Sequence, residues 1–171
     1  MIYFTADWHL LHKNILKYEE RPFKDVQVMA NTLIKNHNNL VTPDDEVWDL
    51  GDFTMVGSGQ RQAIETTIQK LNGHRHLILG NHDRFDPFTY VNMGYTSVHT
   101  AIPLYTKDYT FILCHDPSVY DCVKDKGILL CAHVHKLFKC LPEQRVINVG
   151  IDVWDYKPVS LDQILELVAT F

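Results

Sequence analysis

Five short apolar runs in this chain each end in a cluster of aspartate, asparagine or histidine residues. In chain order the clusters are Asp7-Trp8-His9 after 2–5, Gly51-Asp52 after 47–50, Gly80-Asn81-His82-Asp83 after 76–79, Cys114-His115 after 110–113, and His133-Val134-His135 after 128–130. Apolar runs of this length, bounded by polar residues, are typical of buried strands. Any one cluster alone also fits a strand cap or a turn. Because α/β sheets place their ligands at the carboxyl ends of strands, we expect all five to form one site.

Between the first three runs the pattern changes to that of amphipathic helices. Apolar residues recur every three or four positions over 26–37, with Asp25 as the expected N-cap. A second such pattern covers 63–71 and is expected to stop at Asn72-Gly73. The order strand, helix, strand, helix, strand over residues 1–80 predicts a βαβαβ unit with a parallel sheet.

The second half of the chain has shorter elements. The runs 98–105 and 109–113 predict a β-hairpin, and further strands are expected at 128–131 and 146–149. Ser160-Leu161-Asp162-Gln163 is a capping box, which predicts that a last helix begins there.

Composition sets limits on the class of protein. A chain of 171 residues fits one domain, which we expect to span 1–171. The formal net charge of -5 argues against nonspecific duplex binding, which needs a basic surface. The four cysteines form no C-x-x-C pair, so free thiols are expected rather than a zinc knuckle. With no signal peptide and no membrane-length apolar run, the expected location is the cytoplasm of a bacterium or of a phage-infected host.

In their order and residues the clusters resemble the motifs of the calcineurin-like metallophosphoesterase superfamily: D-x-H, G-D, G-N-H-[D/E], H and G-H-x-H. The resemblance spans Asp7 to His135. The segments 11–15 and 148–154 are similar to those of a branch of small, single-domain phosphoesterases from bacteria and their phages. The resemblance implies an α/β fold: a four-layer α/β/β/α sandwich of two mixed sheets flanked by helices.

The resemblance also implies a site for two metals that share one carboxylate. By the family pattern, Asp7, His9, Asp52 and His135 would hold one metal, and Asp52, Asn81, His115 and His133 the other. Two such ions lower the pKa of a bridging water and clamp a phosphate, so the implied reaction is hydroxide attack on a phosphoester. Mixed oxygen and imidazole ligands suit transition metals better than calcium. We expect two divalent ions, Mn²⁺ first, with iron, zinc or nickel as alternatives.

His82 follows a ligand in the third cluster, and the resemblance makes it the proton donor to the leaving group. Histidine suits general acid catalysis because its ordinary pKa lies near neutral pH. The alternative is a structural role in its loop. Asn81, His12, Asn14 and Arg84 are candidate substrate-binding residues, with a solvated loop as the alternative for the last three.

Several neighbours of the motifs have weaker predicted roles. The second motif, Gly51 to Gly57, lacks the second acid and the arginine of the G-D-x-x-D-R-G pattern, which counts against a protein phosphatase. Asp83 is a candidate to orient His82, and Asp152 is expected to hydrogen-bond a ligand histidine. Trp8 could line the site or stack on a base, although packing in the core is more common.

The predicted function is hydrolysis of a phosphodiester or phosphomonoester of a small molecule, with a nucleotide as the expected substrate. One alternative is a nuclease acting on nucleic acid ends, which the acidic balance disfavours. Another is a non-catalytic binding scaffold of the same fold, which the complete set of ligand positions disfavours. No membrane partner is expected, and the sequence leaves the oligomeric state open. Specificity is expected to lie in the loops 10–24, 54–60, 84–96 and 116–126.

Overall fold

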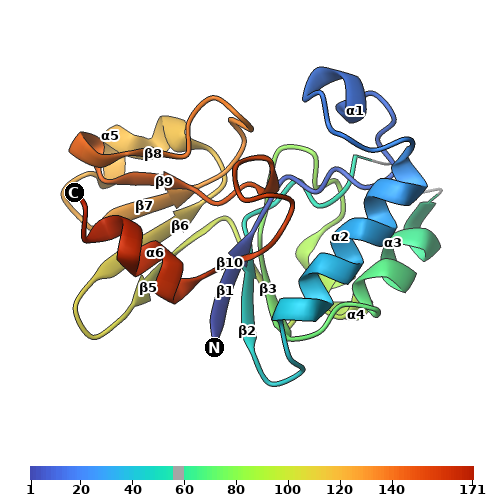
Figure 1. Cartoon of the computed structure of the whole chain (residues 1–171). Coiled ribbons are helices and arrows are strands. Elements are labelled where there is room, and N and C mark those ends of the chain that lie inside the picture. The colour runs from blue at the N-terminus through green and yellow to red at the C-terminus, as the bar shows by residue number, and fades with distance from the viewer. Residues whose placement is uncertain (56–59) are drawn as a thin grey trace.

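The strands of this protein form two five-stranded sheets that pack face to face (Figure 1). The computed structural model describes residues 1–55 and 60–171, so the predicted loop glycines Gly57 and Gly59 lie outside the described residues. The first sheet has the order β10-β1-β2-β3-β4, with β1 at Ile2–Thr5, β2 at Glu46–Asp49, β3 at His74–Ile78, β4 at Ser97–His99 and β10 at Val159–Ser160. The second has the order β5-β6-β7-β9-β8, with β5 at Ala101–Tyr105, β6 at Thr110–Cys114, β7 at Ile128–Cys131, β8 at Cys140–Leu141 and β9 at Val146–Asn148.

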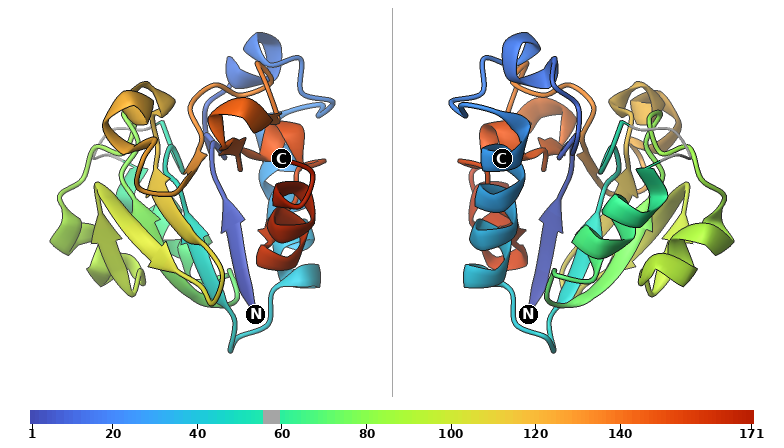
Figure 2. Two further views of the ribbon diagram at one scale, coloured as in Figure 1. Left: turned by 90° about the vertical axis from the view of Figure 1, so that its left-hand side faces the viewer. Right: turned by 90° about the vertical axis from the view of Figure 1, so that its right-hand side faces the viewer.

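The first three strands are parallel and alternate with helices, which confirms the predicted βαβαβ unit. Helix α2 at Val26–Leu40 begins at the predicted cap, because the Asp25 carboxylate accepts hydrogen bonds from two amides of the first turn. Helix α3 covers Arg61–Ile68, and turns carry the chain on to Gly73, whose φ of +95° suits a glycine. Helices α2, α3 and α4 (Pro87–Met93) pack on the outer face of the first sheet (Figure 2).

The predicted hairpin is correct only in part. Residues 97–99 form β4, which pairs in parallel with β3 of the first sheet. The chain then crosses to the second sheet, where β5 pairs antiparallel with β6. The prediction that 98–105 is one hairpin strand was therefore wrong for Val98 and His99. Alternation of apolar residues indicates a strand but not the sheet it joins, so a change of sheet within one run leaves no sequence signal.

The main core lies between the two sheets. Phe4, Ile78, Phe111, Leu130 and Ile147 are fully buried there. The last helix, α6 at Leu161–Val168, packs its apolar face into this core and begins at the predicted capping box. A smaller cluster lies under α5 (Tyr120–Val123), on the outer face of the second sheet. These layers confirm the predicted α/β/β/α sandwich.

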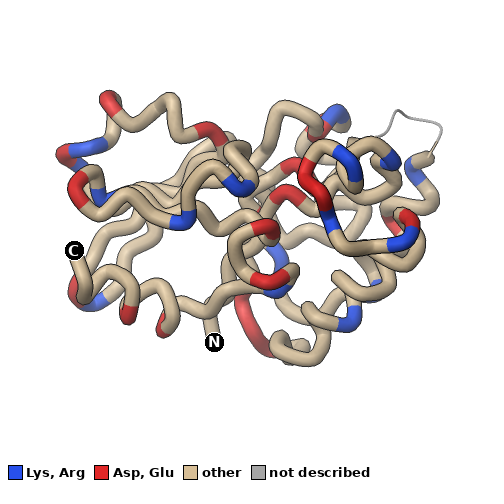
Figure 3. The backbone as a smooth tube through the Cα atoms, turned by 45° about the horizontal axis from the view of Figure 1, so that its top comes forward, with Lys and Arg blue, Asp and Glu red and all other residues tan. Residues whose placement is uncertain are grey.

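The remaining elements are short. They are α1 at Ile15–Tyr18 and the 3₁₀ turns η2 at Pro117–Val119, η3 at Pro142–Gln144 and η4 at Ile151–Val153. All four cysteines are free, as predicted. Within 1–55 and 60–171, no helix has the length and apolar character needed to cross a membrane. Basic and acidic residues are interspersed over several elements (Figure 3).

Candidate metal centre

The polar clusters meet where strands of both sheets end, in the upper middle of Figure 1. Asp52 lies among them. One of its carboxylate oxygens, Oδ2, is 3.7 Å from His9 Nε2 and 3.5 Å from His115 Nε2. The first histidine follows a strand of the first sheet and the second histidine follows a strand of the other. The interface between the sheets is thus the place where the motifs converge.

The predicted ligand atoms fall into two groups, and a third possible group, Glu19, His135 and Asp152, shares His135 with the first. Asp7, His9 and His135 offer atoms that lie within 4.8 Å of one another, and so do Asp52, His115 and His133. Asn81 joins the second group, because its Oδ1 is 3.2 Å from His115 Nε2 and 2.9 Å from His133 Nδ1. The structure therefore places together all seven residues that the resemblance assigned to metals, in the same two sets with Asp52 between them.

Five of these residues have left-handed backbones. The φ angles are 58° at Asp7, 49° at His9, 52° at Asp52, 71° at His133 and 46° at His135. Such conformations cost non-glycine residues about 1–3 kcal/mol each and gather at functional sites. Here they turn the chain sharply just after the strands end, so the side chains point into a shared space.

Glycines allow the backbone to approach the two buried aspartates closely. A Cβ on Gly80 would lie 2.2 Å from Asp52 Oδ1, and a Cβ on Gly150 would lie 2.7 Å from Asp7 Oδ2. Gly51 has φ +92°, and its Cβ would overlap the backbone of Gly80. Glycine at these positions is therefore a packing requirement of the site.

The first group carries buried polar atoms without protein partners. Burial raises the pKa of Asp7 to about 6, while the charges of His135 and His115 act in the opposite direction. Burial lowers the pKa of His9 to about 3, and neither of its ring nitrogens has a hydrogen-bond partner among the described residues. Buried polar groups are normally satisfied. A cation held by Asp7 and His9 would satisfy one of these ring nitrogens, while Asp7 also accepts a hydrogen bond from the backbone N–H of His133 at 3.0 Å.

In the second group, Asp52 is ionised. Burial acts to raise its pKa, but the hydrogen bond and charge of His115 and the backbone N–H of His82 lower it to about 2. His115 donates from Nδ1 to the Leu50 carbonyl at 2.6 Å, which leaves Nε2 facing Asp52 and Asn81. A ring held in this way by its other nitrogen is typical of a metal ligand.

His82 lies beside both groups and belongs to neither. Its side chain is 26% exposed, and its Nε2 is 3.9 Å from Asp52 Oδ2. The prediction that Asp83 orients His82 was wrong: Asp83 Oδ2 accepts hydrogen bonds from the amides of Gly80 and Asp52, both at 2.8 Å. Asp83 thus joins the second and third motifs, and burial raises its pKa to about 7.

Asp152 makes the contact expected of it. Its Oδ2 accepts a hydrogen bond from His135 Nδ1 at 2.9 Å. The buried side chain of Asn148 holds the same segment, since its amide donates to the carbonyls of His135 and Phe138.

The residue that the sequence did not reveal is Arg21, which forms a buried ion pair with Asp152. No local pattern marks Arg21, because it lies in a loop where a solvated arginine is the ordinary reading.

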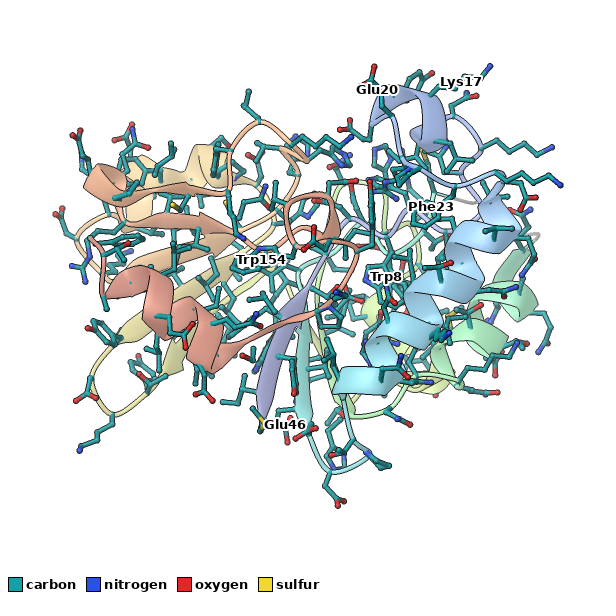
Figure 4. All side chains as sticks on the ribbon, viewed as in Figure 1. Trp8, Lys17, Glu20, Phe23, Glu46 and Trp154 are labelled. Carbon is teal, nitrogen blue, oxygen red and sulfur yellow. The ribbon has the colours of Figure 1, made fainter. Side chains whose placement is uncertain are left out.

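Of the predicted substrate-binding residues His12, Asn14 and Arg84, only His12 lies beside a ligand group. The His12 ring lies 6.0 Å from the His9 ring, beside the first group. Asn14 is exposed at the start of α1, and Arg84 is exposed after the third motif. Neither side chain makes a hydrogen bond or ion pair with a candidate ligand in the described part of the chain. Trp8 is 1% exposed and donates to Thr5 Oγ1, so it packs in the core, as Figure 4 shows.

The other histidines lie outside the cluster, as expected. His37 is buried and bonds the Asn72 carbonyl, and His74 is exposed. His76 bonds Glu46 and Ser97, and His99 bonds Ser97. Glu46, labelled in Figure 4, begins β2 and so lies at the opposite end of that strand from Asp52.

Curated proteins match this chain over nearly its whole length, and two of them are described here. The uncharacterized protein MJ1445 of Methanocaldococcus jannaschii is 35% identical over 173 residues, covering 98% of this chain and 90% of the relative. The gene 66 protein of Mycobacterium phage L5 is 32% identical over 198 residues, covering 97% and 93%. No protein-family model matches the chain.

Solved structures share the fold. The protein of unknown function AQ665 from Aquifex aeolicus superposes with a TM-score of 0.79 at 23% identity and covers 98% of both chains. An archaeal phosphodiesterase superposes with a TM-score of 0.50 at 19% identity, over 87% of this chain and 82% of its own. This chain therefore shares its fold with the Aquifex protein and with the archaeal phosphodiesterase.

Proposed function

This chain belongs to the family of MJ1445 and the gene 66 protein of phage L5, and we propose that it is a two-metal phosphoesterase. The observation that supports this most is the pairing of two ligand groups across one ionised carboxylate, Asp52. An ordinary structural cluster has no need of two such groups, nor of a buried His9 whose ring nitrogens lack hydrogen-bond partners among the described residues.

The residues present fit divalent transition metals. Asp7, His9, Asp52 and His135 would hold one ion, and Asp52, Asn81, His115 and His133 the other. This mixture of imidazole, carboxylate and amide oxygen suits Mn²⁺, iron, zinc or nickel better than calcium. When bound, a metal pair of this kind supplies a hydroxide nucleophile at neutral pH and neutralises charge on the phosphoryl oxygens.

The protein's own contribution is positioning and proton delivery. The backbone N–H of His82 donates to Asp52 Oδ1, so the position of His82 is tied to the shared carboxylate. Its partly exposed imidazole can then give a proton to the leaving oxygen of a bound ester. His12, beside His9, is the candidate in best position to contact the phosphate or the leaving group.

The proposed substrate is a small phosphodiester, with nucleotides as the first class to test. The archaeal phosphodiesterase of the same fold supports the diester preference. Met55 and Val56 stand where a G-D-x-x-D-R-G motif would place its second acid and its arginine. This sequence argues against phosphoproteins as substrates.

The direct test measures metal content and hydrolysis together. After reconstitution with Mn²⁺, elemental analysis should give two metals per chain, and bis-p-nitrophenyl phosphate should be cleaved. Asp52→Ala should lose both properties. Asp86→Ala, which removes only the cap of α4, is the matched control and should keep both.

The substrate class needs a separate screen. Cyclic nucleotides, dinucleotides, nucleoside polyphosphates and short nucleic acids would be compared with the wild-type, manganese-loaded protein. Preferred cleavage of nucleic acid ends would identify a nuclease instead. Two bound metals without turnover of any ester would identify a non-catalytic scaffold.

A further inference from the structure

Arg21 is a buried arginine whose guanidinium lies at the base of the first ligand group. The side chains of Arg21 and Asp152 are both 0% exposed. Nε donates to Asp152 Oδ1 at 2.8 Å and Nη2 donates to Asp152 Oδ2 at 2.7 Å, which is a two-point contact. Such forked pairs fix the relative orientation of both partners.

The same guanidinium also holds the first motif. Nη2 donates to the Asp7 carbonyl at 2.7 Å, and Nη1 donates to the Trp8 carbonyl at 3.0 Å. These carbonyls belong to the left-handed turn that carries Asp7 and His9. Without Arg21 they would lose buried partners, and the strained turn would be free to relax.

Through Asp152, Arg21 reaches the last motif as well. Asp152 accepts from His135 Nδ1, which leaves Nε2 as the ring nitrogen available for a metal. Arg21 balances the charge of Asp152 in a fully buried place, and an unpaired carboxylate there would be costly. Loss of Arg21 should therefore also disturb the orientation of His135.

The second ligand group is held by other contacts. His115 is fixed by the Leu50 carbonyl, and the loop that carries Asn81 is fixed by Asp83 through Gly80. No hydrogen bond joins Arg21 to Asn81, His115 or His133 in the described residues. Of the two groups, Arg21 hydrogen-bonds directly only to the first within the described residues. The groups are linked to each other by the backbone N–H of His133, which donates to Asp7 Oδ2 at 3.0 Å.

We propose that Arg21 is the positioning residue of the first ligand group, so that it controls metal affinity at Asp7, His9 and His135 but not at the other position. This rests on the proposed two-metal function. It predicts that the two metal positions can be uncoupled by one substitution at a residue that binds neither ion.

The test compares metal affinities in Arg21→Lys and Arg21→Met with those of wild type, by calorimetric titration of Mn²⁺ into metal-free protein. Loss of a supporting residue typically costs 10- to 100-fold in metal affinity. We expect about that loss at one of two sites, with the other unchanged. Lysine keeps the charge without the fork and should give the smaller loss.

Arg75 provides a matched control. It is also buried and pairs with Asp49 at 2.9 Å, but its side-chain hydrogen bonds go to Asp49 and Tyr95, neither of which is a candidate ligand. Arg75→Lys and Arg75→Met should lower the melting temperature without weakening one metal position selectively. If the Arg21 and Arg75 variants change both affinities by the same factor, Arg21 is only structural and the proposal is wrong.

A readout without metal separates this proposal from the proposed function. In the metal-free wild type, nitrogen NMR should show His135 with its proton on Nδ1. In Arg21→Lys, and in Arg21→Met where it folds, the Nε2–H form should increase. An unchanged His135 spectrum would overturn the positioning role even if metals bind. A protein that binds no metal yet shows this spectral change would overturn only the two-metal function.

Discussion

The backbone of Gly80 faces the carboxylate of Asp52 so closely that a Cβ at position 80 would lie 2.2 Å from Oδ1 and 2.5 Å from the Asp52 amide nitrogen. Neither atom can move easily, because that amide donates to Asp83. The backbone of the third motif thus lies in direct contact with Asp52 of the second motif. Position 80 must be glycine because no room remains there for a Cβ.

Gly80→Ala should therefore displace Asp52 and abolish the binding of both metals. Asp52 is the only one of the seven candidate ligands assigned to both positions, so even a small shift of its carboxylate affects each. The measurement is metal stoichiometry after reconstitution with Mn²⁺.

Gly127→Ala is the control for this substitution. Its Cβ would lie 2.3 Å from the Thr110 carbonyl, a comparable overlap at the far end of β7. It should lower stability but keep two metals per chain. Equal metal loss in both variants would show that general destabilisation, not the Gly80 contact, removes the ions.

The pH dependence of stability should show the contribution of His37. Burial lowers its pKa to about 4 in the folded protein, with the charge of Arg75 acting in the same direction and the Asn72 hydrogen bond against it. Its ordinary pKa is about 6.5, so between these values the unfolded chain binds more protons. The contribution of neutral, buried His37 to the free energy of unfolding is therefore complete above pH 6.5, and it is lost as the pH falls toward 4.

The expected size of this effect is roughly 3 kcal/mol, from about 1.4 kcal/mol per pKa unit. Urea unfolding of the metal-free protein at several pH values would measure it. His37→Gln should be less stable at pH 7 and should lose less stability on acidification. Parallel curves for the variant and wild type would exclude His37 as a source of the slope.

Much of the fold and the site followed from the sequence, because both depend on local patterns. The capping residues Asp25 and Ser160 fixed where helices begin, and the acid and histidine clusters marked strand ends. The role of Arg21 could not be predicted from the sequence, because its partner Asp152 lies 131 positions later and a lone arginine in a loop has no local signature. Asp83 was misread for a related reason, since sequence adjacency to His82 does not say where its carboxylate points.

Metal binding should also stabilise the folded chain. Ions that bind only the folded state add about 2.7 kcal/mol when their free concentration is 100-fold above Kd. Thermal unfolding with increasing Mn²⁺ should show a rising melting temperature that a chelator reverses. Asp52→Ala should show no rise. A rise that persists in Asp52→Ala would place the stabilising ion elsewhere.

The last prediction separates metal binding from proton delivery, and it depends on His82 lying beside both ligand groups without belonging to either. His82→Asn should keep two bound metals. It should slow turnover of an alkyl or nucleoside ester by about 10²- to 10⁴-fold, the usual contribution of a general acid. A p-nitrophenyl ester should be affected less, because its leaving group departs without a proton. His135→Ala, in contrast, should weaken metal binding and slow both esters alike. If His82→Asn loses metal, or slows the two esters by the same factor, then His82 is a ligand or a loop anchor and another group must supply the proton.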